Sequence, residues 1–155
     1  MKIPFLAWLF QGLPEAIGIA AVMYAVAGRS LRWRSIVTMG FIFGVAFYLI
    51  RLLPIAFGIN TVFNFLFTVA VFKQLTYCNL AIAIRSGLVA LITVVLAETI
   101  FIPLFVLILD MSIEEIYSNL LLRILSGWPS VVMLFVVAVL ASKFIKKDLH
   151  RGWAR

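Results

Sequence analysis

The sequence predicts an all-α, polytopic membrane helix bundle on three observations: its apolar composition, its long uninterrupted apolar runs and the placement of its basic residues. Of the 155 residues, 65% are hydrophobic and only 12% are charged, and the mean hydropathy is +1.19. A soluble domain is typically about 45–50% apolar and about 25% charged. We therefore expect the hydrocarbon of a lipid bilayer to be the main solvent of this chain.

The apolar runs decide between helices and a β-barrel, the two structures that satisfy every backbone hydrogen bond within hydrocarbon. Barrel strands alternate apolar and polar residues over about ten positions, whereas residues 35–57 and 87–109 are apolar almost throughout. At about 20 residues per span, the chain has room for five helices with short connections. It has no room for a separate catalytic domain.

Five transmembrane helices and one amphipathic surface helix are expected in a single membrane domain. The first span is the most polar and contains Pro14. We interpret it as a retained span rather than a cleaved signal peptide, because it is longer than a typical h-region and contains Gln11 and Glu15. The third span is the least clear, because Lys73 interrupts it early. The expected spans are residues 4–27, 35–57, 61–80, 87–109 and 128–145, followed by a basic tail at residues 146–155.

Residues 113–126 are expected to form an amphipathic helix on the membrane surface rather than a span. Their apolar residues recur at the spacing of one helical face. Ser112 and Glu115 stand three residues apart, which is the spacing of a capping box. The final span is expected to open at Trp128 and Pro129, because proline is tolerated in a first helical turn.

The basic residues predict the orientation, because cytoplasmic loops carry an excess of Lys and Arg. With five spans, the residues that fall on one side are Arg29, Arg32, Arg34, Lys73, Arg85, Lys143, Lys146, Lys147, Arg151 and Arg155. The opposite side has Lys2 and Arg123. The sequence therefore predicts a multi-pass plasma-membrane protein with its N-terminus outside and its C-terminus in the cytoplasm.

The net charge of +7 is expected to set the orientation of the chain in the membrane and to contact anionic lipids. We expect no nucleic acid as partner. Contacts to anionic lipid head groups are expected from Arg29, Arg32, Arg34, Lys146, Lys147 and Arg151. The single Cys78 excludes an internal disulfide, and no Cys/His spacing indicates a metal site. No catalytic set is visible, so we expect neither enzymatic activity nor a cofactor.

Three ionisable residues inside the expected spans are the candidate functional groups, since charges in a bilayer are costly and mark functional sites. They are Glu15, Arg51 and Glu98. At a rise of about 1.5 Å per residue, Arg51 would lie about 10 Å and the two glutamates about 16–18 Å below the outer surface. We expect the three to meet in the outer half of the bundle, with Gln11 and Asn64 lining the same space.

Three interpretations of this cluster stay open at the level of sequence. The charges could pair to hold the bundle together, they could floor an outward-facing ligand pocket, or they could belong to a proton or ion pathway. A buried ion pair is weak evidence of stabilisation, because the desolvation cost can match the Coulomb gain.

The order of features resembles the N-terminal membrane sensor region of histidine kinases with a GHKL-type ATPase domain, relatives of the quorum-peptide receptors. The matching stretches are Pro4-Phe5 with Gln11 and Glu15, residues 48–54 (YLIRLLP), residues 57–60 (FGIN), Glu98 and residues 121–129 (LLRILSGWP). In that family the last span leads into a phosphorylated dimerisation helix and an ATP-binding domain. Here it is followed by about ten polar residues, and His150 has no matching phospho-acceptor context.

The resemblance implies a sensor-like membrane module, free-standing or excised, without kinase activity. It implies action as a homodimer or through a signalling partner in the membrane or cytoplasm. The function expected from the sequence is therefore that of a non-enzymatic sensor or regulatory module with an outward-facing polar pocket. The alternative is a component that binds or transports a small solute, although no internal repeat supports a transporter of two inverted halves.

Overall fold

The chain folds into helices joined by short turns. The computed structural model describes residues 5–53 and 57–152, and for residues 57 and 146–152 it describes the backbone alone. No strand occurs in the described residues, which confirms the predicted all-α class. The elements are α1 (Phe5–Ala7), the π-helix η1 (Trp8–Gly12), α2 (Leu13–Val26), α3 (Trp33–Leu52), α4 (Phe57–Thr76), α5 (Leu80–Leu109), α6 (Ile113–Ser118) and α7 (Leu120–Gly152).

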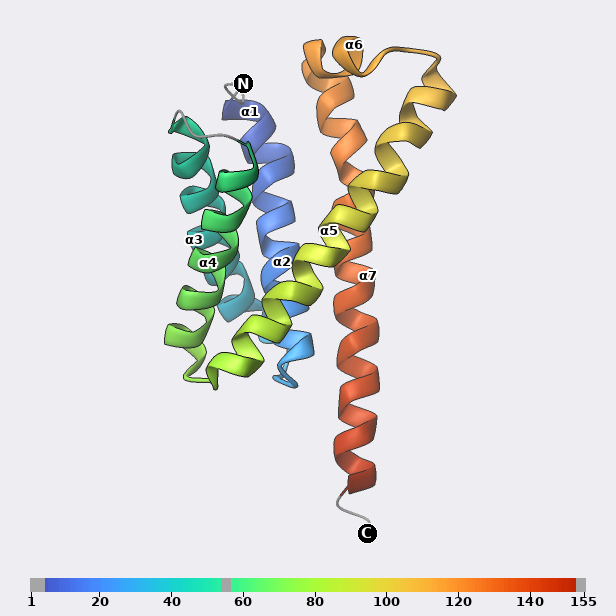
Figure 1. Ribbon diagram of the computed structural model, residues 1–155. Helices are drawn as coiled ribbons and strands as arrows, with labels where there is room; N and C mark the ends of the chain where they lie inside the picture. The colour runs from blue at the N-terminus through green and yellow to red at the C-terminus, as the bar shows by residue number, and fades with distance from the viewer. Residues whose placement is uncertain (1–4, 54–56, 153–155) are drawn as a thin grey trace.

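Successive long helices run in alternating directions along the bundle (Figure 1). One end holds the beginning of α1 and the short helix α6, and we call it the α6 end. The other end holds the turn between α2 and α3, and we call it the Arg29 end. The described chain therefore begins and finishes at opposite ends of the bundle, and α7 extends beyond the other helices at the Arg29 end (Figure 1).

Helix α2 occupies the centre and packs against α3, α5 and α7. Its buried residues are mostly small, and they lie on all sides of the helix rather than on one stripe. They include Ala16, Gly18, Ala20, Ala21, Val22, Met23 and Ala25. A helix that is apolar all round belongs in a core or in lipid, and small side chains let its neighbours approach closely.

The closest approach is between α2 and α3. A Cβ atom added to Gly40 would lie only 2.5 Å from Ile17 Cα, so only glycine fits there. One turn further along α3, Gly44 also faces α2, but less tightly, because an added Cβ would lie 3.0 Å from Leu13 Cδ1 and 3.6 Å from Ala16 Cβ. The G-x-x-x-G spacing of these two glycines places both on one helix face, an arrangement typical of close helix pairs in membranes.

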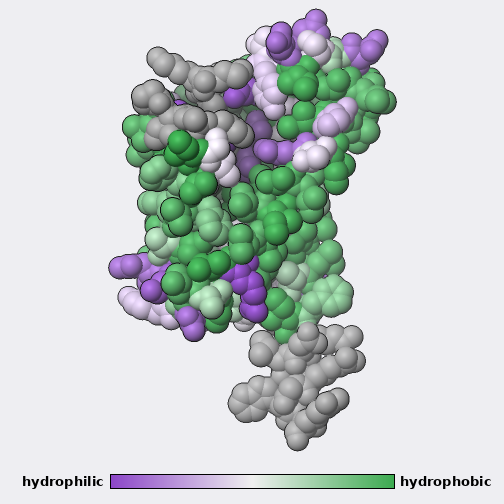
Figure 2. Space-filling model, viewed as in Figure 1, coloured by the Kyte–Doolittle hydropathy of each residue, from purple (hydrophilic) through white to green (hydrophobic). Residues whose placement is uncertain are grey.

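Four helical segments are long and apolar enough to cross a membrane. They are Phe5–Val26, Trp33–Leu52, Leu80–Leu109 and Leu120–Ile145, and the surface between the two ends is mostly hydrophobic (Figure 2). Helix α4 is 20 residues long but is not among them. Two asparagines and the Lys73-Gln74 pair lower its hydropathy, so the fifth span stays a prediction.

Helix α5 begins earlier than expected, at Leu80, because Asn79 caps it by accepting a hydrogen bond from the Ala81 N–H (3.4 Å). Its 30 residues correspond to about 45 Å, longer than the roughly 30 Å hydrocarbon core of a bilayer. The helix runs obliquely across the bundle (Figure 1), as an over-long span does by tilting.

The segment after α5 corrects the sequence-based boundaries. The capping box of Ser112 and Glu115 is confirmed, but helix α6 stops at Ser118 instead of running to residue 126. Asn119 has an extended backbone and accepts a hydrogen bond from the Leu121 N–H (3.1 Å), so it caps a new helix. Helix α7 therefore starts at Leu120 rather than at residue 128, and Pro129 lies inside it.

Candidate functional site

The structure places the three charged residues in the half of the bundle towards the α6 end. Glu15 lies in the first turn of α2, Arg51 in the last turn of α3 and Glu98 in the second half of α5. Glu15 interacts electrostatically with both Glu98 and Arg51, and Glu98 also interacts with Arg51. Three helices that are distant in sequence thus bring their charged groups to one place.

A hydrophilic recess is visible at this end of the molecule (Figure 2). The upper parts of α5 and α7 lie to its right, and hydrophobic surface lies below it (Figure 2). Glu15 is partly buried, whereas Glu98 and Arg51 are exposed. Glu98 and Arg51 therefore lie on the surface of the bundle, and Glu15 lies partly beneath it.

Gln11 lies at the contact between η1 and α7. Its side chain lies directly against Gly127, where an added Cβ would overlap the Gln11 amide. Gln11 belongs to the π-helix η1, and a π-helical turn in an otherwise α-helical segment often marks a functional site. Gly127 is a residue that sequence reasoning missed as part of the site, although it belongs to the SGWP stretch of the resemblance.

Trp8 is a second missed residue at the same end. Its indole N–H donates a 2.8 Å hydrogen bond to the Gly44 carbonyl, and its ring contacts Phe5 and Tyr48. These contacts fasten the first helical segment to α3. The signal in the sequence is the spacing of Gly44 and Tyr48, which stand one helical turn apart on the same face.

Asn64 is placed differently from the other predicted pocket residues. Its side-chain oxygen is buried without a hydrogen-bond partner, and its backbone carbonyl accepts a 2.6 Å hydrogen bond from Thr68. In the described part of the chain, no hydrogen bond joins Asn64 to the charged residues. The structure therefore brings together Glu15, Arg51 and Glu98, but it does not connect Asn64 to them.

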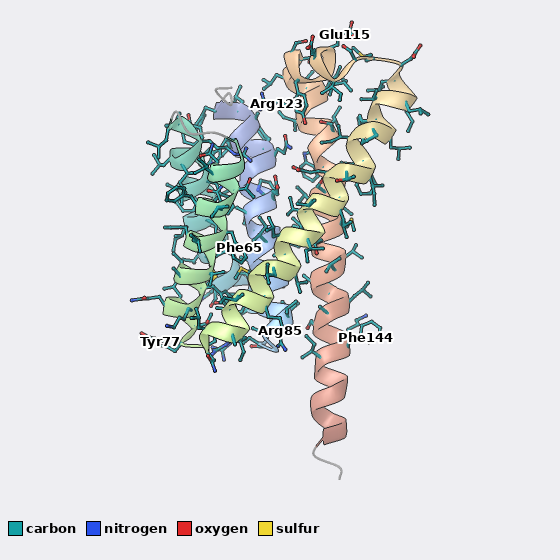
Figure 3. The ribbon with its side chains drawn as sticks, viewed as in Figure 1. Phe65, Tyr77, Arg85, Glu115, Arg123 and Phe144 are labelled. Carbon is teal, nitrogen blue, oxygen red and sulfur yellow. The ribbon has the colours of Figure 1, made fainter. Side chains whose placement is uncertain are left out.

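The predicted lipid-contacting arginines lie at the opposite end of the bundle. Arg29, Arg32 and Arg34 are all exposed, on or beside the turn between α2 and α3. Figure 3 shows Arg85 and Tyr77 at this same end, whereas Glu115 and Arg123 lie at the α6 end. The other three residues predicted to contact lipid are Lys146, Lys147 and Arg151, and the structure does not describe their side chains.

Within the described residues, no group of three or more His, Cys, Asp or Glu side chains is placed to hold a metal ion. Cys78 is a free thiol, partly buried near the end of α4. Comparison of the chain with family models, with curated proteins and with solved structures finds no match.

Proposed function

We propose that this protein is a non-enzymatic integral membrane sensor or regulatory module, in which the recess at the α6 end faces outwards and binds a ligand. The observation that carries the proposal is the electrostatic interaction among Glu15, Arg51 and Glu98, contributed by three different helices. Ionisable groups inside apolar helices are costly, so their convergence favours a functional site.

The membrane part of the proposal rests on the four apolar helices, with α4 as the fifth span. Large apolar side chains are exposed along these helices, among them Phe41, Ile92, Leu104 and Val132. Such an exposed surface is unfavourable in water and suits lipid. The alternating helix directions and the basic residues of the Arg29 end support an outside N-terminus and a cytoplasmic C-terminus.

Sensing is favoured over transport because the other half of the bundle is closed by apolar packing. Phe43, Phe72 and Leu134 are fully buried in one core with the second half of α2. A transport path would need polar groups through this region, and the buried polar residues among those that the structure describes are all Thr and Ser. The recess is therefore proposed to end at an apolar floor.

The charges of the recess favour a ligand with a cationic group. Two carboxyl groups, Glu15 and Glu98, lie within electrostatic range of one guanidinium, Arg51, so the cluster has one acidic group in excess. An ammonium group can donate to a carboxylate in a strong charge-assisted hydrogen bond. The N-terminus of a peptide and a small amine both present such a group, and the peptide fits the resemblance to the sensor regions of quorum-peptide receptors.

Thermal unfolding of the purified protein in detergent, with n-butylammonium as the probe, tests the proposal. We expect butylammonium to raise the melting temperature of the wild type and to have no effect on the Glu15→Gln/Glu98→Gln double variant. Glu114→Gln is the matched control, because it removes an exposed carboxylate at the same end of the molecule. Equal shifts in all three proteins would rule out a cation-binding cluster at these two residues.

Solute uptake into liposomes distinguishes a sensor module from the alternative, a transport component. A sensor module leaves butylammonium outside the vesicles, whereas a transporter accumulates it in a manner that depends on Glu15 and Glu98. Uptake by the wild-type protein and its loss in the double variant would establish the transport function instead.

A further inference from the structure

A second polar site lies at the Arg29 end, far from the charged recess. It is an open cavity of about 390 Å³ beside the turn between α2 and α3. Its lining residues are Tyr24, Arg29, Ser30, Arg32, Ser35, Leu75 and Thr76. Among these described residues there are two guanidinium groups, several hydroxyls and no acidic group.

The backbone that carries the two arginines is ordered by a Schellman motif at the end of α2. The Arg29 N–H donates to the Tyr24 carbonyl, and the Gly28 N–H donates to the Ala25 carbonyl, each at 3.0 Å. Gly28 has a φ of 70°, the left-handed conformation that this motif requires and that glycine adopts without strain. The turn thus holds the backbone of Arg29 in a defined position.

Hydrogen bonds to α4 and α5 hold the neighbouring helices around this turn. The Arg29 guanidinium donates to the Thr76 carbonyl at the end of α4. Arg85 of α5 donates to the Val26 carbonyl in the last turn of α2 (3.3 Å). Because Arg29 uses only one N–H for this bond, it keeps other donors of its five for a ligand.

The start of helix α3 adds to the positive character of the cavity. Arg32 is the N-cap of α3, and because a guanidinium has no acceptor, no side chain caps the first turn. The free N–H groups and the dipole at a helix N-terminus favour an anion. Ser35, in that first turn, also lines the cavity.

We propose that this cavity binds the phosphate of one anionic phospholipid head group. Arg29 and Arg32 would pair with the phosphate oxygens, because the planar guanidinium forms two parallel hydrogen bonds to phosphate. Ser30 and Ser35 would donate hydroxyl hydrogen bonds to the head group. A basic pocket between helices is a known form of lipid-head-group site in membrane proteins.

The surroundings favour a lipid over a free phosphate ion. The cavity lies at the end of the apolar helix surface, where lipid head groups begin, and the exposed Leu75 on its wall suits a lipid chain. The inference needs the chain to be in a membrane but needs nothing of the recess at the α6 end. A negative result for one site would therefore leave the proposal for the other site unaffected.

Native mass spectrometry of the detergent-solubilised protein tests the inference with three probes: phosphatidylglycerol, phosphatidylcholine and inorganic phosphate. We expect the wild type to retain one phosphatidylglycerol in preference to phosphatidylcholine and to retain no inorganic phosphate. The Arg32→Gln variant should bind this lipid about tenfold more weakly, because it loses a charge-assisted hydrogen bond.

Arg34→Gln is the matched control, because Arg34 carries the same charge two residues away but does not line the cavity. It should bind phosphatidylglycerol as the wild type does. Ser35→Ala is a second variant that keeps every charge, and we expect it to weaken binding by a smaller factor. Equal losses in Arg32→Gln and Arg34→Gln, or equal binding of phosphatidylcholine, would overturn the inference, and retention of inorganic phosphate would assign the cavity to free anions.

Discussion

The two ends of the bundle are built from different kinds of contact. At the Arg29 end, backbone carbonyls of α2 and α4 are bonded to arginines of other segments, and the core beside them is apolar. At the α6 end, a hydrophilic recess is visible (Figure 2), and the flexible side chain of Gln11 lies against Gly127. The backbones of α2 and α3 meet directly at Ile17 and Gly40, whereas η1 and α7 meet there through a side chain.

The two kinds of contact differ in how far they can adjust. A contact between backbones cannot adjust without separating two helices, whereas a contact made by a long side chain can change its rotamer. We therefore expect stability to reside in the pair α2 and α3, and conformational change to be confined to the α6 end.

The largest effect is predicted at Gly40, because an alanine there would meet the backbone of Ile17. We expect Gly40→Ala to destabilise the protein by about 1–3 kcal/mol, the usual cost of overpacking. Tryptophan fluorescence during SDS-induced unfolding measures this cost. Gly58→Ala is the matched control, since a Cβ at Gly58 would have no atom within 4 Å. Equal stability of the two variants would contradict the close packing of α2 against α3.

A smaller effect is predicted at Gly127, where the three atoms nearest to an added methyl group all belong to the Gln11 side chain. We expect Gly127→Ala to cost less than about 1 kcal/mol, because Gln11 can move and alanine is the better helix former. The double variant Gln11→Ala/Gly127→Ala should be more stable than Gly127→Ala alone, which a double-mutant cycle detects. A cost at Gly127 as large as that at Gly40 would mean that both ends are equally rigid.

The smallest effect is predicted at helix α6, outside the apolar helices. Hydrogen bonds from the Ser112 backbone and hydroxyl lower the pKa of Glu115. The ionised carboxylate therefore stabilises α6 above the unfolded-state pKa, and this stabilisation is lost as the pH falls through the lower pKa of the folded state. The protection factors of residues 113–118 against hydrogen exchange, each taken relative to the intrinsic exchange rate at that pH, should fall on acidification, and Glu115→Gln should remove that fall. An unchanged pH response in Glu115→Gln would show that the cap does not set the stability of α6.

Much of this architecture follows from the sequence because hydrophobicity and helix caps act locally. The apolar runs predict the helices, and Ser112 with Glu115 predicts the start of α6. The turn at Asn119 was missed, because the apolar face continues across it and only the cap chemistry of asparagine reveals the break. The G-x-x-x-G of Gly40 and Gly44 is a visible signal, but the partner helix it contacts is a property of the fold.

The candidate site was predictable in part for the same reason. Depth along each span, at a fixed rise per residue, suffices to place Glu15, Arg51 and Glu98 at similar heights. The rotation of each helix about its own axis is set by packing, which the sequence does not state. This is why the approach of Gln11 to Gly127 and the separate position of Asn64 emerge only in the structure.

Thiol labelling of intact cells shows whether the Glu98 position opens to the outside of the cell, as we propose. Glu98→Cys in a Cys78→Ala background should react with a membrane-impermeant maleimide added to intact cells. The wild type provides the internal comparison, because Cys78 lies near the Arg29 end and should react only after the cells are made permeable. Labelling of Cys78 but not of the Glu98→Cys variant in intact cells would contradict the account.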